Sequence, residues 1–187
     1  MSAEDRVLRI GVTGHRAFDD PPAHVEARVA AGLAGLLRLA EGGESGSRAR
    51  LEVLSGLAEG ADRLVARTAL EMPGATLVAV LPCPTDEYER DFGLEVSRRE
   101  FRGLLARARQ VEVMRPGVSR EAGYALQGCW IVDRSQVLLA VWDGEPSRGH
   151  GGTADTLAYA ADRGVPILWV RVRRPAPPGG PLGADRS

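Results

Sequence analysis

Residues 10–16, which read IGVTGHR, decide the fold, and two later stretches are built in the same way. Residues 53–63 read VLSGLAEGADR, and residues 141–144 read VWDG before a loop that closes with GHGGT at 149–153. In each stretch an apolar, strand-like run ends in a turn of small residues, and a helix-like segment follows. In an open parallel sheet such turns meet at the carboxyl ends of the strands, which is the edge where ligands bind.

Apolar runs alternate with helix-like segments along the chain. The pattern predicts strands at residues 7–12, 51–54, 75–81, 110–114, 137–142 and 165–172. It predicts helices at residues 21–40, 60–71, 94–108, 120–132 and 153–163, and an acidic, irregular segment at 84–93. Strict alternation with right-handed crossovers predicts an α/β, Rossmann-like fold: one doubly wound, mostly parallel sheet of about six strands with helices on both faces.

The length of the chain favours a single domain. Its 187 residues are enough to bury a real core, and we expect that domain to span residues 1–172. Residues 173–187 are rich in proline and glycine, and we expect them to form a disordered tail.

The charge balance is close to neutral, with 26% charged residues and a formal net charge of −1. It gives no global electrostatic attraction for nucleic acid or for an acidic membrane. All 24 basic residues are arginine, which excludes lysine Schiff-base chemistry and a Walker-type loop with its lysine.

Cys83 and Cys129 form no CxxC pair, so the sequence predicts neither a disulfide framework nor a metal site, and it points to no cofactor. Without a signal-like apolar region or a run of 18 apolar residues, we expect a cytoplasmic protein that does not enter a membrane.

The first turn offers two candidate ligand-binding side chains beside the small residue Gly14. Arg16 is placed to pair with a phosphate or carboxylate, and His15 is suited to donate a hydrogen bond or to act as a general acid. The alternative is that His15 caps the turn and Arg16 makes a surface ion pair.

The second turn is built from the small residues Ser55, Gly56 and Gly60, which would let a ligand approach the backbone. Glu59 is a candidate acceptor for ribose hydroxyls. Asp62 lies in the first turn of the following helix, where the helix dipole favours a carboxylate, and we expect it to be structural. The turn is not a GxGxxG dinucleotide fingerprint.

The third turn places Gly151, Gly152 and Thr153 at the start of a helix, where amides, hydroxyl and helix dipole would form an anion cradle. The alternative is a flexible loop with a threonine cap. Asp143 ends the preceding strand and could orient a water or a ribose hydroxyl. The acidic residues 86–91 could rim the pocket, although we favour a solvated charged face.

Taken together, the three turns resemble the SLOG (SMF/DprA–LOG) superfamily, Rossmann-like domains that include the Lonely Guy phosphoribohydrolases and nucleotide sensors. The resemblance spans residues 7–172 and rests on GVTGHR at 11–16, SGLAEGAD at 55–62 and GGT at 151–153. It implies a nucleotide or nucleotide-derived ligand bound across these turns. The Lonely Guy motif PGGxGTxxE has a catalytic glutamate, where this chain has Thr156. Asp155 is adjacent but points about 100° away around the helix.

The leading hypothesis is a cytoplasmic sensor or carrier of a nucleotide-derived small molecule, with a homo-oligomer as one option for its assembly. The expected ligand-binding residues are Gly14, His15, Arg16, Ser55, Gly56, Glu59, Gly60, Gly151, Gly152 and Thr153. One alternative is a Lonely Guy-like hydrolase of nucleotide N-glycosidic bonds, with Glu59, Asp143 or Asp155 as acid or nucleophile. The other is a scaffold that has kept only a vestigial cleft.

Overall fold

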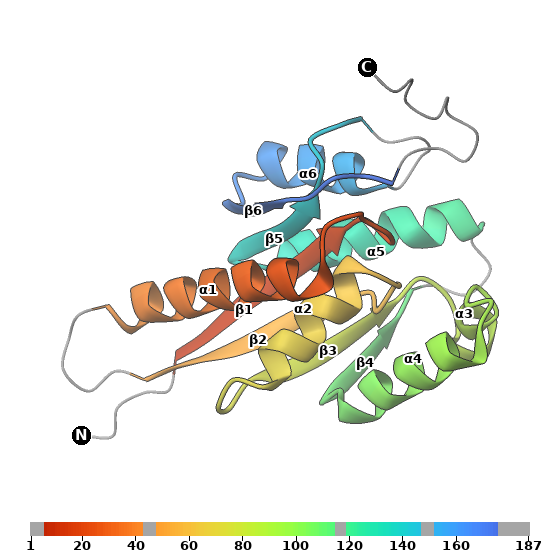
Figure 1. Cartoon of the computed structure of the whole chain (residues 1–187), viewed down its shortest axis with the longest axis horizontal. Coiled ribbons are helices and arrows are strands. Elements are labelled where there is room, and N and C mark those ends of the chain that lie inside the picture. Colours follow the sequence, from red (N-terminus) through yellow and green to blue (C-terminus); the bar gives the residue numbers. More distant parts are fainter. Residues whose placement is uncertain (1–5, 43–47, 115–118, 147–151, 176–187) are drawn as a thin grey trace, which may run out of the picture.

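Strand β1 (Arg6–Gly14) lies inside the sheet, with β2 (Ala49–Ser55) and β5 (Val137–Trp142) as its parallel neighbours. The computed structural model describes residues 6–42, 48–114, 119–146 and 152–175. The remaining strands are β3 (Thr76–Leu81), β4 (Gln110–Val113) and β6 (Ile167–Arg171). All six strands are parallel in the order β4-β3-β2-β1-β5-β6, which confirms the predicted α/β sheet (Figure 1).

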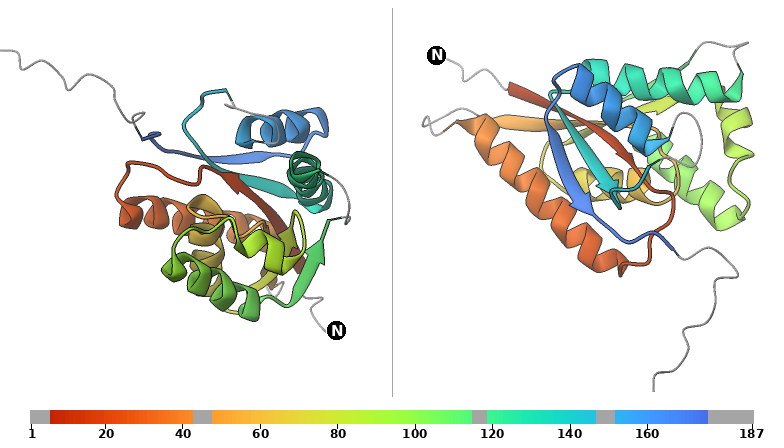
Figure 2. Two further views of the ribbon diagram at one scale, coloured as in Figure 1. Left: turned by 90° about the vertical axis from the view of Figure 1, so that its right-hand side faces the viewer. Right: turned by 90° about the horizontal axis from the view of Figure 1, so that it is seen from above.

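Two layers of helices cover the two faces of this sheet (Figure 2). Helices α1 (Pro22–Glu41), α2 (Ala61–Leu70) and α4 (Glu95–Arg107), with the short α3 (Thr85–Glu89), pack on one face and share one apolar core. Helices α5 (Arg120–Arg134) and α6 (Thr153–Asp162) pack on the other face around a second core. Within the described ranges, none of these helices is long and apolar enough to cross a membrane.

The chain changes direction across the sheet between β1 and β5. From β1 it continues through α1 to β2 on one side, whereas β5 continues through α6 to β6 on the other. The two connecting helices lie on opposite faces (Figure 2). Such a switch point leaves a crevice at the carboxyl ends of the strands, which is where open α/β sheets bind ligands.

The acidic segment 84–93 is not irregular, as its composition had suggested. It contains α3, whose Tyr88 is fully buried and packs edge-on against Phe92 and Phe101 with ring centroids 5.1 and 5.6 Å away. Two aromatic anchors therefore override the charged composition and hold the segment on the sheet. Three of its carboxylates form ion pairs: Glu87 and Asp91 with Arg120, and Glu89 with Arg102.

The packed chain continues past the expected boundary at residue 172. The backbone N–H of Arg173 donates to Asp20 Oδ2 at 2.6 Å, and the carbonyl of Arg173 accepts the N–H of Asp19 at 3.0 Å. The expected tail therefore begins with residues that contact the loop between β1 and α1. Residues 176–187 lie outside the described part of the chain.

Candidate functional site

His15 and Arg16 follow β1 directly and reach toward different neighbours. The N–H of His15 donates to the carbonyl of Val141 on β5 at 3.0 Å, and its Nε2 lies 2.8 Å from Asp143 Oδ1. Arg16 Nη2 donates instead to the hydroxyl of Tyr124 on α5 at 2.8 Å. The first turn therefore spans the switch point, with one side chain on each side of it.

Asp143 is a nearly buried carboxylate, with 7% of its side chain exposed. Burial acts to raise its pKa, but the N–H of Glu145 and the contacts with His15 and Arg174 outweigh it and bring the pKa to about 2. Asp143 is therefore ionised at neutral pH and cannot supply a proton as a general acid.

Arg16 is held in place by a chain of hydrogen bonds. The Tyr124 hydroxyl that accepts from Arg16 donates in turn to Asp91 Oδ2 at 2.7 Å, and Asp91 also pairs with Arg120. Among the described residues no carboxylate contacts Arg16 directly, and the residue remains exposed. Its guanidinium is thus positioned by a neutral hydroxyl rather than by a carboxylate.

In the second turn, backbone N–H groups donate hydrogen bonds to side chains of the same turn. Asp62 accepts the N–H of Ala58 at 3.3 Å, and Ser55 Oγ accepts the N–H of Leu57 at 3.1 Å. Ser55 is completely buried. These contacts give Asp62 and Ser55 structural roles inside the turn.

The glycines of the first two turns allow close packing against neighbouring segments of the chain. Gly60 has φ of +78°, and a Cβ there would collide with the backbone carbonyl of Arg16. A Cβ on Gly56 would lie 2.7 Å from Gln127 Nε2 on α5, and one on Gly14 would lie 2.5 Å from the carbonyl of Val141. The turns after β1 and β2 therefore lie against each other, as the shared edge requires, but the space beside these glycines is filled by protein.

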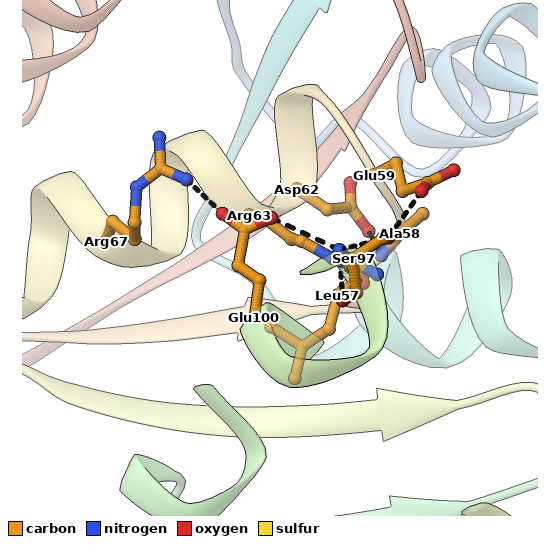
Figure 3. A network of polar contacts seen from close by, with 8 residues as sticks. All are labelled: Leu57, Ala58, Glu59, Asp62, Arg63, Arg67, Ser97 and Glu100. Atoms are coloured by element: carbon orange, nitrogen blue, oxygen red, sulfur yellow. Dashed lines mark hydrogen bonds and ion pairs between the residues drawn. The ribbon is translucent and has the colours of Figure 1, made fainter. Parts of the chain in front are cut away.

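Glu59 faces α4, as Figure 3 shows. Its carboxylate accepts a hydrogen bond from Ser97 Oγ, and Ser97 Oγ accepts another from Arg63 Nη1 at 2.8 Å. Arg63 is 1% exposed and also donates to the carbonyl of Leu57 at 3.0 Å. The expected ribose acceptor is thus part of a polar network that joins α2 to α4.

The third turn caps its own helix. Gly152 is the N-cap of α6, and its N–H donates to Asp155 Oδ2 at 3.3 Å. Thr153 is the first residue of the helix, while Gly151 lies outside the described residues. Because α6 follows β5, Gly152 and Thr153 lie at the same edge of the sheet as Gly14.

Each of the three candidate catalytic carboxylates contacts a different part of the protein. Glu59 accepts a hydrogen bond from Ser97, and Asp155 accepts one from the N–H of Gly152. Asp143 contacts both His15 and Arg174. In the part of the chain that the structure describes, no group of three or more His, Cys, Asp or Glu side chains is placed to hold a metal ion.

Sequence reasoning missed three residues around this edge. Tyr124, Ser97 and Arg174 are far in the chain from the residues they hold. The only available signal was for Tyr124, one of two aromatic residues, with Trp130, in the helix expected at residues 120–132.

Comparison with known proteins does not add to this geometry: no family model matches the chain, and no curated protein matches it in sequence.

Proposed function

We propose that this chain is a cytoplasmic protein that binds a nucleotide-derived, phosphorylated small molecule at the carboxyl edge of its sheet, as a sensor or carrier. The observation that carries the proposal is the position of Arg16, an exposed residue at the switch point whose guanidinium is held by the Tyr124 hydroxyl at 2.8 Å. Arginine binds phosphate through paired N–H donors, and a pre-positioned side chain loses less entropy when it does so.

The start of α6 supports the same proposal. Thr153 opens that helix at the edge where β1 and β5 end, so the positive end of the helix dipole lies at the ligand-binding edge. A phosphate between Arg16 and Thr153 would gain a charge-assisted contact from the first and an amide or hydroxyl contact from the second.

The carboxylates favour binding over cleavage of the ligand. Asp143 has its pKa lowered to about 2, after its hydrogen bonds overcome the effect of burial. Asp155 caps α6, and Glu59 is held by Ser97. An N-glycosidase needs one carboxyl group that can donate a proton, and none of these three is arranged for that role.

Calorimetric titration with a panel of nucleoside 5′-monophosphates tests the proposal. We expect wild type to bind at least one of them, and Arg16→Ala to weaken that binding by about 1.5–3 kcal/mol. The matched control is Arg99→Ala, which removes an exposed arginine from α4 far from the switch point in sequence. Equal loss in both variants, or no binding by wild type, contradicts the proposal, and release of free base would favour the hydrolase.

A further inference from the structure

The chain does not leave the body of the protein after β6 but crosses the carboxyl edge of the sheet. The N–H of Val172 donates to the carbonyl of Trp142, the last residue of β5, at 3.1 Å and extends the β5–β6 ladder by one bond. The backbone of Arg173 then contacts Asp19 and Asp20 in the loop after β1. Val172 itself is 3% exposed. We call residues 172–174 the C-terminal strap.

Arg174, the last residue of the strap, forms an ion pair with the carboxylate of Asp143. Its Nη2 donates a hydrogen bond to Oδ1 at 3.2 Å, and its Nε lies 2.6 Å from Oδ2 in an ion-pair contact that lacks hydrogen-bond geometry. Only 20% of the Arg174 side chain and 7% of the Asp143 side chain are exposed. An arginine–carboxylate ion pair with one hydrogen bond and little exposure is held more firmly than a flexible surface ion pair.

The position of this pair matters because Asp143 also contacts His15 at 2.8 Å. A negative charge at that point would repel an anion that approaches His15 and Arg16. The positive charge of Arg174 lies beside the Asp143 carboxylate and offsets its negative charge. The neighbouring Arg173 does not offset the charge of Asp143, because its side chain is 76% exposed and its charged partner is Asp20 at 3.8 Å.

We propose that Arg174 is a positioning residue of the ligand site, which neutralises Asp143 and thereby allows an anionic group to bind beside His15 and Arg16. This inference rests on the proposed function for its ligand. It adds Arg174 to the site, and it makes the affinity for an anion depend on the balance of charge between two residues, Arg174 and Asp143, that need not touch the ligand.

The test is a double-mutant cycle read by calorimetry, with AMP and inorganic pyrophosphate as probes. Arg174→Gln should weaken binding by about tenfold or more, because it leaves Asp143 uncompensated in a poorly solvated place. The loss caused by Arg174→Gln should shrink to less than about threefold when Asp143→Asn is already present. Arg174→Lys should recover part of the affinity, since it restores the charge without the fork.

Arg173→Gln is the matched control, because it removes the same charge from the same strap without touching Asp143. We expect it to change affinity by less than about threefold. Thermal melts of every variant check that each remains folded. Raised salt should reduce the difference between wild type and Arg174→Gln, an effect that a purely structural role would not produce.

The outcomes separate this inference from the proposed function. If AMP binds and Arg174→Gln leaves its affinity unchanged, or if Asp143→Asn does not reduce the loss, the inference is wrong and the function stands. If pyrophosphate binds with the predicted dependence but no nucleotide binds, the inference stands and the nucleotide assignment falls. If neither probe binds wild type, both are wrong.

Discussion

The carboxylate of Asp62 accepts the N–H of Ala58 at 3.3 Å, across the turn that joins β2 to α2. Burial raises the pKa of this carboxyl to about 7, although the Ala58 N–H and the nearby Arg16 act to lower it. Asp62 therefore binds a proton in the folded protein at pH values where the unfolded chain, with its ordinary value of 3.8, has lost it.

Because of this difference in pKa, we predict that the contribution of Asp62 to the free energy of unfolding falls as the pH rises. With the folded pKa above the unfolded one, the stabilisation is complete below about pH 4 and is lost as the pH rises through about 7. Asp62→Asn removes the titration, so its stability relative to wild type should increase between pH 5 and pH 8 by about 1–3 kcal/mol. Urea unfolding at the two pH values measures the change. Asp143→Asn is the control, because a pKa of about 2 leaves Asp143 ionised at both pH values.

Gly60 should resist substitution, whereas Gly103 should accept it. Gly60→Ala places a Cβ against the backbone of Arg16 at a positive φ, so we expect a loss of about 1–3 kcal/mol or more. Gly103 lies within α4 with open space around its Cβ position, and Gly103→Ala should stabilise by about 0.5–1 kcal/mol. Urea unfolding compares the two, and a neutral Gly60→Ala would contradict the packing described for the turns.

Arg63 should be far more important for stability than its neighbour Arg67. Arg63→Met leaves the carbonyl of Leu57 and the hydroxyl of Ser97 without their buried donor, which should cost about 3–5 kcal/mol. Arg67 pairs with Glu100 at the surface, with 44% of its side chain exposed, so Arg67→Ala should cost less than about 1 kcal/mol. Similar losses in the two variants would show that the network in Figure 3 is not held by its buried member.

Truncation should separate the strap from the residues beyond it. A chain that ends at Arg174 keeps the contacts to Asp143 and Asp20, so its melting temperature should match that of the full chain. A chain that ends at Val172 loses both and should melt a few degrees lower, on the scale of about 1 kcal/mol. Differential scanning calorimetry of the two chains is the measurement, and equal melting temperatures would mean that the strap is not a fixed part of the fold.

Thr153→Ala should weaken nucleotide binding by about 1–2 kcal/mol, the range of one hydrogen bond to a charged group. Stability should change little, since Gly152 rather than Thr153 caps α6. Titration beside a thermal melt measures both quantities. An unchanged affinity in a folded variant would remove the start of α6 from the proposed site.

The sheet was predictable from the sequence because its strands are largely apolar runs that end in turns of small residues, as in residues 51–56, where Glu52 is the one charged residue. Helix α3 was not, since Tyr88 and Phe92 act as anchors only once the chain has folded over the sheet. The contacts that position the candidate site were also hidden. Arg16 and Tyr124 are 108 residues apart, and Asp143 and Arg174 are 31 apart, and local pattern carries no information about such pairs.

The C-terminal strap also has a consequence for biosynthesis. Strands β1, β2 and β3 have emerged from a ribosome long before Arg174 is made, so a nascent chain can pair its first strands while Asp143 still lacks its partner. The candidate site therefore acquires its final charge only when synthesis has passed residue 174. A stalled chain would carry a largely complete sheet, with Asp143 still lacking its arginine partner at the carboxyl edge.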